Sequence, residues 1–380
     1  PHPQPLLPPE VMAYQSPLSP VTVTLAPCFK EATMPEEVLG CARRFSAEEL
    51  EESLMLPFRS VAVLPGFCVG CALSLGAAVS VSVFFVAGPV MTMWGAPARA
   101  EAVAYLTAST EGADAGIVIS ASHNPFEDNG IKIFGGAGYK LTDGEEARIE
   151  ALIDAPPADK KTGGELGAVR PFDGDPADVY VRHVAGTAPF RLNGMRIAVD
   201  CANGASSSTA EKLFRALGAD AVILNQSPDG VNINTNCGST HIEGLQEVVR
   251  KGHFAAGAAF DGDADRCLMV DETGEVIDGD CLIGLLAQSM KARGKLRGGA
   301  VGTILTNLGL HAFLQSQDIP VLSTQVGDRY VLEKMREEGW NIGGEQSGHV
   351  ILSDYATTGD GQLTAVQFLC ALKESGERAS

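Results

Sequence analysis

Short apolar runs alternate with amphipathic stretches along the chain after residue 100. Residues 116–120 and 131–134 are apolar runs on either side of a polar turn, which predicts two strands. Residues 143–154 begin with acidic side chains and place apolar residues on one face, which predicts a helix.

The same alternation continues in two further stretches. Residues 196–200 and 221–224 predict strands on either side of a helix at 210–217, which Gly218 ends. The later predicted elements are a helix from about 280, strands at 299–305 and 320–322 with a helix between them, and a helix at 330–338 closed by Gly339. Strands that alternate with helices predict an α/β fold, in which mixed or parallel sheets are covered by helices.

These patterns divide the chain. Residues 154–178 are rich in Pro, Gly and Asp and predict a linker. We expect an atypical segment at 1–100, the remainder of a first domain at 101–154, a second domain at 155–277 and a third at 278–372.

The first hundred residues differ from the rest. They hold thirteen of the 21 prolines, and the first aspartate is Asp114. The stretch 60–98 has no charged residue and exceeds the ~18 apolar residues of a membrane span, but Pro and Gly interrupt it. Its most apolar part, residues 79–86, is β-branched and favours a buried strand, so we do not expect membrane association. The alternative is a segment that is foreign or frame-altered.

Net charge and cysteine content indicate which kinds of ligand and cellular compartment the protein has. The chain carries 28 Lys and Arg against 47 Asp and Glu, a net charge of −19, which excludes general binding to nucleic acid. An anionic substrate would need a local basic cluster. Nine cysteines are too sparse for a disulfide scaffold, so we expect a cytoplasmic protein. The pair Cys68 and Cys71 lacks a second pair at zinc-site spacing, and we expect no metal there.

The first of three polar loops spans residues 120–125. Pro125 fixes a turn that displays the hydroxyl of Ser122 beside His123. The loop is either a strand-to-turn cap or the display of a reactive serine. No G-x-S-x-G elbow surrounds Ser122, which argues against acyl transfer.

The second loop carries Asp261, Asp263 and Asp265 between two predicted strands. Three carboxylates at this spacing can converge on one hard cation, Mg²⁺ or Ca²⁺, or form a solvated acidic turn. An EF-hand would need Gly at the position of Arg266 and helices on both sides. Two alternatives remain. One is a phosphatase that uses an aspartate nucleophile, and the other is a metal site paired with a phosphorylated side chain. Arg266 favours a phosphate-handling site, because its planar fork grips phosphate oxygens.

The third loop, residues 343–349, places Glu345 and Ser347 between glycines. Both side chains can face one ligand, an arrangement that suits the hydroxyl groups of a sugar. A glycine-rich hairpin without a ligand is the alternative.

Together and in this order, the three loops resemble the α-D-phosphohexomutase superfamily. The resemblance covers about residues 101–372, and the run Glu345-Gln-Ser-Gly-His349 is similar to the amino-sugar branch. The supporting runs are residues 114–132, 232–240, 324–331 and 355–360.

The resemblance implies four domains around one cleft, the first three built alike. It implies that Ser122 carries a phosphate and that one Mg²⁺ per active site is held by this group together with Asp261, Asp263 and Asp265. The groups around the transferring phosphoryl would be His123, Lys132, Arg266 and His349. The groups around the sugar would be Glu345 and Ser347, with a neighbouring substrate loop of Gly327, Asp328 and Arg329.

The implied activity is that of an isomerase. It would interconvert glucosamine 6-phosphate and glucosamine 1-phosphate through a sugar bisphosphate, for amino-sugar precursors of the cell wall. Lys132 and His349 are both candidates for moving the hydroxyl proton. The alternatives are a mutase for glucose or mannose phosphates and a non-catalytic protein that binds a sugar phosphate or Mg²⁺. The oligomeric state is not predicted.

Three departures from the superfamily stand out. Residues 1–100 contain no glycine-rich arginine loop, the chain stops at Ser380 without a fourth domain, and Ala264 stands where Gly is usual. We therefore expect a fragment with weak or no turnover on its own, because the distal phosphate would lose its anchor.

Overall fold

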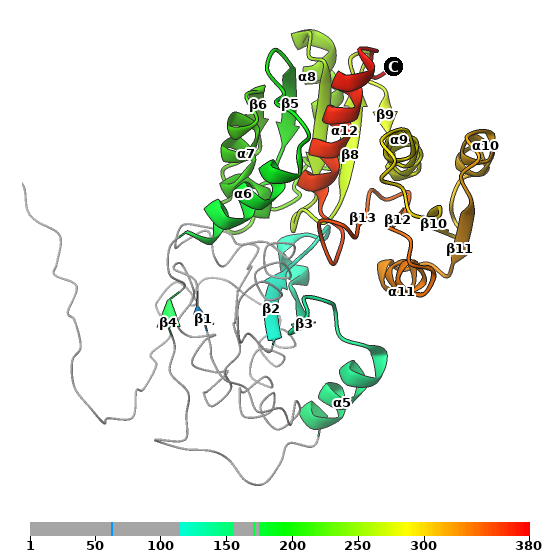
Figure 1. Ribbon diagram of the computed structural model, residues 1–380. Helices are drawn as coiled ribbons and strands as arrows, with labels where there is room; N and C mark the ends of the chain where they lie inside the picture. The colour runs from blue at the N-terminus through cyan, green and yellow to red at the C-terminus, as the bar shows by residue number, and fades with distance from the viewer. Residues whose placement is uncertain (1–61, 64–114, 155–169, 172–174) are drawn as a thin grey trace, which may run out of the picture.

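The computed structural model describes residues 62–63, 115–154, 170–171 and 175–380 (Figure 1). The expectations for segment 1–100 and its strand at 79–86, for Cys68 and Cys71, and for most of the 154–178 linker lie outside the described residues, apart from the pair 62–63. There, β1 (Ala62–Val63) pairs in parallel with β4 (Arg170–Pro171).

Unit I, residues 115–154, is an antiparallel hairpin followed by a helix. Strand β2 (Ala115–Ser120) pairs with β3 (Gly130–Gly135), and the 3-10 turn η3 (Phe126–Asp128) lies in the loop between them. Helix α5 (Asp143–Asp154) has the predicted bounds. It begins where it does because Thr142 and Glu145 form a capping box: the Thr142 amide donates to Glu145 Oε2 at 2.7 Å.

Unit II, residues 175–277, is built on a five-stranded mixed sheet in the order β6-β5-β7-β8-β9. The first three of these strands in the sheet are parallel, and β8 and β9 are antiparallel additions. The strands are β5 (Arg196–Asp200), β6 (Asp220–Leu224), β7 (Ala256–Phe260), β8 (Cys267–Asp271) and β9 (Val276–Ile277). The helical elements are α6 (Pro176–Thr187), η5 (Ala205–Ser208), α7 (Ala210–Ala216) and α8 (Glu243–Gly252).

Helix α6 corrects the predicted linker at its end. Asp175 caps the helix by accepting from the Ala177 amide at 2.9 Å, and Pro176 occupies its first turn. Residues 176–178 are therefore helical rather than part of a linker.

The sheet of unit II is buried on both faces. Ala198 and Ala259 face helix α8, whereas their neighbours Val199 and Phe260 pack in the core on the opposite side with α6 and α7. Burial on both faces explains why these strands are continuous apolar runs rather than alternating ones.

Unit III, residues 278–380, repeats the arrangement with the sheet order β11-β10-β12-β13. Its elements are α9 (Gly279–Ala292), β10 (Ala300–Thr303), α10 (Leu308–Ser316), β11 (Val321–Thr324), α11 (Asp328–Glu338), β12 (Ile342–Gly344), β13 (Val350–Leu352) and α12 (Gly361–Ser375). In both sheets the first strand in sequence has the second and third as parallel neighbours, and the fourth is antiparallel to the third. The hairpin loops β7–β8 and β12–β13 therefore occupy equivalent positions, and loop β2–β3 of unit I also joins an antiparallel pair.

Helix α12 follows the sheet of unit III and packs against both units, on α9 in unit III and beside β8 and α6 in unit II (Figure 1). Its residues Leu363, Phe368 and Leu369 are buried in one core that includes both sheets. Asp360 caps the helix and accepts from the Tyr180 hydroxyl of α6 at 2.7 Å. Within the described ranges, no helix has the length and apolar character needed to cross a membrane.

Candidate active site

The three loops identified in the sequence meet at the junction of the units. We call them the serine loop (residues 121–129), the aspartate loop (residues 261–266) and the glycine loop (residues 345–349). Gly262 lies directly against the serine loop, because a Cβ at this position would overlap the carbonyl oxygen of Ser122. Arg266 and His349 form an isolated β-bridge between the other two loops.

Ser122 has a left-handed backbone with φ of +52°, which few residues other than glycine adopt. Its amide donates to Ser120 Oγ at 3.0 Å, and its Oγ lies 3.5 Å from His123 Nδ1. Asn234 of unit II donates from Nδ2 to the carbonyls of Ser122 and Asn124, each at 2.8 Å. The serine loop thus contacts both Gly262 of the aspartate loop and Asn234.

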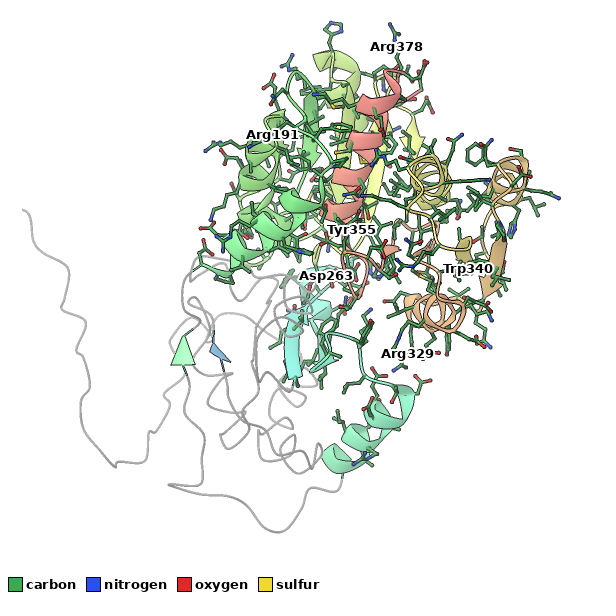
Figure 2. All side chains as sticks on the ribbon, in the orientation of Figure 1. Arg191, Asp263, Arg329, Trp340, Tyr355 and Arg378 are labelled. Carbon is green, nitrogen blue, oxygen red and sulfur yellow. The ribbon has the colours of Figure 1, made fainter. Side chains whose placement is uncertain are left out.

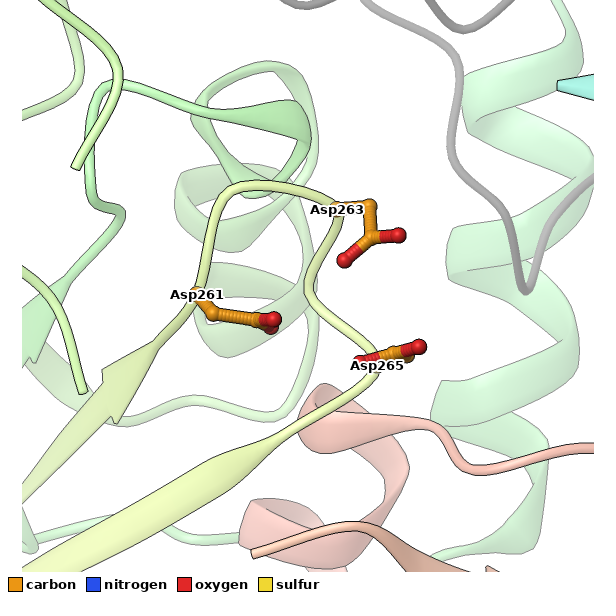
Figure 3. A group of neighbouring side chains, drawn as sticks. All are labelled: Asp261, Asp263 and Asp265. Carbon is orange, nitrogen blue, oxygen red and sulfur yellow. The ribbon is translucent and has the colours of Figure 1, made fainter. Parts of the chain in front are cut away.

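The three aspartates converge as the spacing predicts (Figure 3). One carboxylate oxygen from each of Asp261, Asp263 and Asp265 lies within 4.8 Å of the others, and all three residues are buried. Within the described part of the chain, each also has one buried oxygen without a hydrogen-bond partner. Buried anions with unpaired oxygens are unfavourable without a cation, so this group fits a hard divalent ion such as Mg²⁺.

Ala264 gives the aspartate loop its turn. Its φ is +60° and its side chain is buried, which explains physically why glycine suits this position. The sequence departure at residue 264 therefore leaves the convergence of the carboxylates intact.

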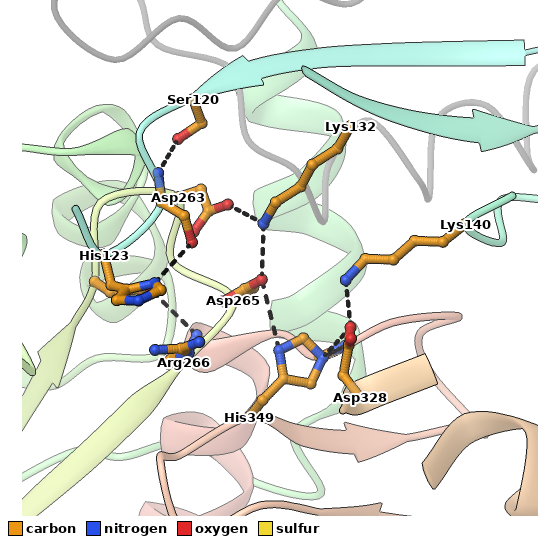
Figure 4. Close-up of polar contacts among 12 residues, drawn as sticks. Ser120, His123, Lys132, Lys140, Asp263, Asp265, Arg266, Asp328 and His349 are labelled. Carbon is orange, nitrogen blue, oxygen red and sulfur yellow. Dashed lines mark hydrogen bonds and ion pairs between the residues drawn. The ribbon is translucent and has the colours of Figure 1, made fainter. Parts of the chain in front are cut away.

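Lys132 of β3 supplies positive charge from unit I (Figure 4). Its Nζ contacts Asp263 Oδ2 and lies 3.1 Å from Asp265 Oδ2. Burial lowers the pKa of Lys132, but the carboxylates of Asp263 and Asp265 outweigh burial and raise this pKa well above its usual range. Burial and the other two carboxylates raise the pKa of Asp261 well above its usual range.

His349 is buried between two carboxylates. The Gly359 amide lies 2.8 Å from its Nε2 and donates to it. Nδ1 lies 3.5 Å from Asp265 Oδ2, and Nε2 lies 3.5 Å from Asp328 Oδ2. Asp265 is acidic for this reason: burial raises its pKa, but Lys132 and His349 outweigh burial and hold the pKa well below its usual range.

Lys140 completes a row of alternating basic and acidic side chains. The row runs from Lys132 through Asp265, His349 and Asp328 to Lys140 (Figure 4). Its Nζ contacts Asp328 Oδ2. Burial raises the pKa of Asp328, but His349 and Lys140 outweigh burial and lower this pKa to about 2. The row connects units I, II and III by charge.

Other segments of unit III hold the glycine loop in place by hydrogen bonds. The Gly327 amide donates to Glu345 Oε1 at 2.9 Å, and Gln346 donates to Asp278 Oδ2 at 3.0 Å. The Gly279 amide donates to the Gln346 carbonyl at 3.0 Å. Ser347 is exposed. The structure thus brings Glu345 next to Gly327 of the 327–329 segment.

Two arginines have different surroundings. The amide of Arg266 donates to Asp261 Oδ1 at 3.1 Å, and its Nε is buried without a hydrogen-bond partner in the described residues. Burial and the Arg266 charge lower the pKa of His123. Arg329, in contrast, contacts Asp143 and the Leu141 carbonyl of unit I, apart from Asp263 (Figure 2).

Sequence analysis assigned no role to Lys140, Asp278 or Asn234. Asn234 lies in the run 232–240 that supported the resemblance, so a signal was present. Lys140 and Asp278 are ordinary charged residues in the sequence, and only the packing of the units shows their partners.

Comparisons with known proteins agree with this geometry. Sequence models of the α/β/α domains I, II and III of phosphoglucomutase/phosphomannomutase match residues 77–159, 178–274 and 278–380. These matches extend beyond the predicted stretch 101–372 at both ends.

The phosphoglucosamine mutase of Pseudomonas entomophila is 50% identical over 283 residues, which is 74% of this chain and 63% of the relative. The phosphoglucosamine mutase of Brucella anthropi is 48% identical over 300 residues, which is 78% of this chain and 64% of the relative. The chain therefore spans less than two thirds of these relatives.

Two solved structures show the same fold. A phosphoglucomutase/phosphomannomutase family protein from Burkholderia thailandensis has a TM-score of 0.72 at 26% identity, covering 90% of this chain and 74% of that one. The N-acetylphosphoglucosamine mutase of Aspergillus fumigatus, in complex with GlcNAc-6P and magnesium, has a TM-score of 0.57 at 20% identity, covering 74% and 75%.

Proposed function

This chain belongs to the phosphoglucomutase/phosphomannomutase family, and we propose that it carries the phosphoserine, metal and sugar loops of a hexosamine-phosphate mutase. The reaction would interconvert glucosamine 6-phosphate and glucosamine 1-phosphate for cell-wall precursors. The observation that carries the proposal is the contact of the Ser122 loop with the buried aspartate trio. Relatives named phosphoglucosamine mutase at about 50% identity favour the amino sugar.

The proposed chemistry is two phosphoryl transfers. In the first, the bond between phosphorus and Ser122 Oγ breaks and a bond from phosphorus to a sugar hydroxyl oxygen forms, while Ser122 Oγ gains a proton in place of the one that the sugar hydroxyl loses. The product is a sugar bisphosphate. After this intermediate turns over in the site, its other phosphoryl group returns to Ser122, so no phosphate is consumed overall.

Phosphoryl transfer requires alignment and charge neutralisation more than covalent help. Mg²⁺ held by Asp261, Asp263, Asp265 and the phosphoserine would neutralise charge on the transferring group. Arg266 has an unpaired buried donor for a phosphate oxygen. His123, one residue along the serine loop, would donate to another oxygen.

Lys132 and His349 suit electrostatic roles. The raised pKa of Lys132 keeps its ammonium charged, which favours stabilising negative charge and disfavours accepting a proton. His349 uses Nε2 for the Gly359 amide and directs Nδ1 toward Asp265. We propose that these two residues fix the electrostatics around the phosphoryl group.

Sugar recognition is assigned to the glycine loop. The Gly327 amide binds Glu345 Oε1, so Oε2 can accept from a sugar hydroxyl. Exposed Ser347 would contact a second hydroxyl, with Gly327, Asp328 and Arg329 as the neighbouring loop. A sugar phosphate partner agrees with the GlcNAc-6P and glucose 1,6-bisphosphate complexes of the Aspergillus fumigatus enzyme. Cytoplasmic location is supported by the free cysteines of the described residues.

The test is transfer of phosphate to Ser122. The chain is incubated with Mg²⁺ and a hexose 1,6-bisphosphate, and its intact mass is measured. We expect one phosphate adduct that Ser122→Ala abolishes and that the exposed control Ser323→Ala retains. An adduct that persists in Ser122→Ala, or a chain that gains none, contradicts the proposal. A panel of glucosamine, glucose and mannose phosphates as acceptors then identifies the substrate.

A further inference from the structure

Asn234 lies in unit II, but its side chain binds the backbone of unit I. Its Nδ2 donates to the carbonyl oxygens of Ser122 and Asn124, both at 2.8 Å. An amide NH₂ carries two hydrogens, so these bonds use both of its donors. The residue is 5% exposed, which shields both bonds from water.

The surrounding backbone holds this amide in one place. Asn234 has φ of +58°, and its own amide donates to the Ala202 carbonyl at 2.9 Å. Gly262 fills the remaining space, since a Cβ there would approach Asn234 Nδ2 to 2.9 Å and would overlap Ser122 O. The amide therefore has little freedom to turn away from the serine loop.

The serine loop needs such an external contact. Ser122 adopts a left-handed backbone that is unfavourable for a residue with a side chain. Without Asn234, the Ser122 and Asn124 carbonyls would lose a buried donor, which is unfavourable compared with keeping the bonds.

We propose that Asn234 is a positioning residue that clamps the serine loop over the aspartate trio and so aligns Ser122 Oγ for phosphoryl transfer. The inference rests on the proposed function of Ser122. Asn234 touches the backbone of the serine loop and acts through Ser122. Its loss should therefore lower the rate of transfer without changing the affinity for the phosphoryl donor.

Two variants and a matched control separate this role from general destabilisation. Asn234→Gly removes the amide and tolerates the positive φ, and Asn234→Asp keeps the shape but turns an acceptor toward two carbonyls. The control is Asn236→Gly, since Asn236 has φ of +52° in the same segment and is exposed.

Hydrogen exchange of residues 120–126 in the full chain is the first measurement. The second is the rate of Ser122 phosphorylation at increasing concentrations of a hexose 1,6-bisphosphate with Mg²⁺. For both Asn234 variants we expect exchange about tenfold faster, from the loss of two hydrogen bonds. We also expect the maximal rate of Ser122 phosphorylation to fall by about 10- to 100-fold, while the bisphosphate concentration that gives half of this rate changes less than about twofold, because misalignment affects the reacting geometry. Asn236→Gly should match the unsubstituted chain in both.

The outcomes are distinct. Unchanged exchange in the Asn234 variants overturns the clamp. Faster exchange with an unchanged maximal rate of phosphorylation, or with a change only in the half-saturating bisphosphate concentration, overturns the positioning role. If the unsubstituted chain gains no phosphate at Ser122, the proposed function fails together with this role, while the exchange data still decide whether the contact exists.

Discussion

The aspartate loop and the glycine loop occupy equivalent hairpins of two similar sheets, yet they differ in burial and in how many of their polar side chains already have partners. The aspartate loop is buried, with Asp261 and Asp263 at 0% exposure, and its carboxylates meet Lys132 and His349. In the glycine loop Glu345 is only partly buried and Ser347 is exposed. The same topology thus gives one loop with charges arranged before any ligand arrives and another that leaves polar groups for the ligand to engage.

The largest expected effect is on Mg²⁺ binding by the aspartate loop. Asp263→Asn removes one charge of the trio, and we expect Mg²⁺ affinity to fall by about 100-fold or more, because affinity for hard cations depends steeply on ligand charge. Isothermal titration with Mg²⁺ measures this. Ser347→Ala in the open loop is the comparison and should leave Mg²⁺ binding unchanged. Equal losses in both variants would remove the distinction between the loops.

An intermediate effect concerns Asp328, which contacts His349 of the glycine loop and Lys140 of unit I. The pKa of Asp328 is lowered from 3.8 to about 2, so this carboxylate stabilises the fold above about pH 4, and the contribution is lost as pH falls toward 2. We expect Asp328→Asn to lower the free energy of unfolding by roughly 2 kcal/mol at about pH 6 and by much less near pH 2. Urea unfolding across this range is the measurement.

Lys140→Met serves as the partner variant for Asp328→Asn. It removes one of the charges that lower the pKa of Asp328, so it should flatten the same part of the pH profile. A stability difference that does not depend on pH would show that packing, rather than charge, holds this link.

The smallest expected effect lies in the open loop. Gln346→Ala removes the bond to Asp278 Oδ2, while Asp278 Oδ1 still caps helix α9. The loss of one partly exposed hydrogen bond should raise the Kd for glucosamine 6-phosphate about three- to tenfold. Isothermal titration with this sugar phosphate checks the prediction, and an unchanged Kd would contradict it.

Local features of the site could be predicted from the sequence. The bounds of α5 followed from the acidic residues at its start and its apolar face, because both signals lie within a few residues. The convergence of Asp261, Asp263 and Asp265 followed from their spacing on one turn. Such patterns need no knowledge of how the units pack.

Contacts between distant segments could not be predicted in this way. Lys140 pairs with Asp328, and Arg329 of the predicted substrate loop contacts Asp143 of α5. The two carbonyls bound by Asn234 belong to another unit. These partners depend on the docking of units I, II and III, for which the sequence offers no periodic signal.

Helix α12 has a consequence for how the protein is made. The sheet of unit II ends at Ile277, but helix α12, which packs beside its strand β8, begins only at Gly361. A chain that has left the ribosome only as far as β9 therefore exposes the apolar surface that Leu363, Phe368 and Leu369 later bury. Until unit III has been synthesised, the apolar surface beside β8 therefore stays open to chaperones or aggregation.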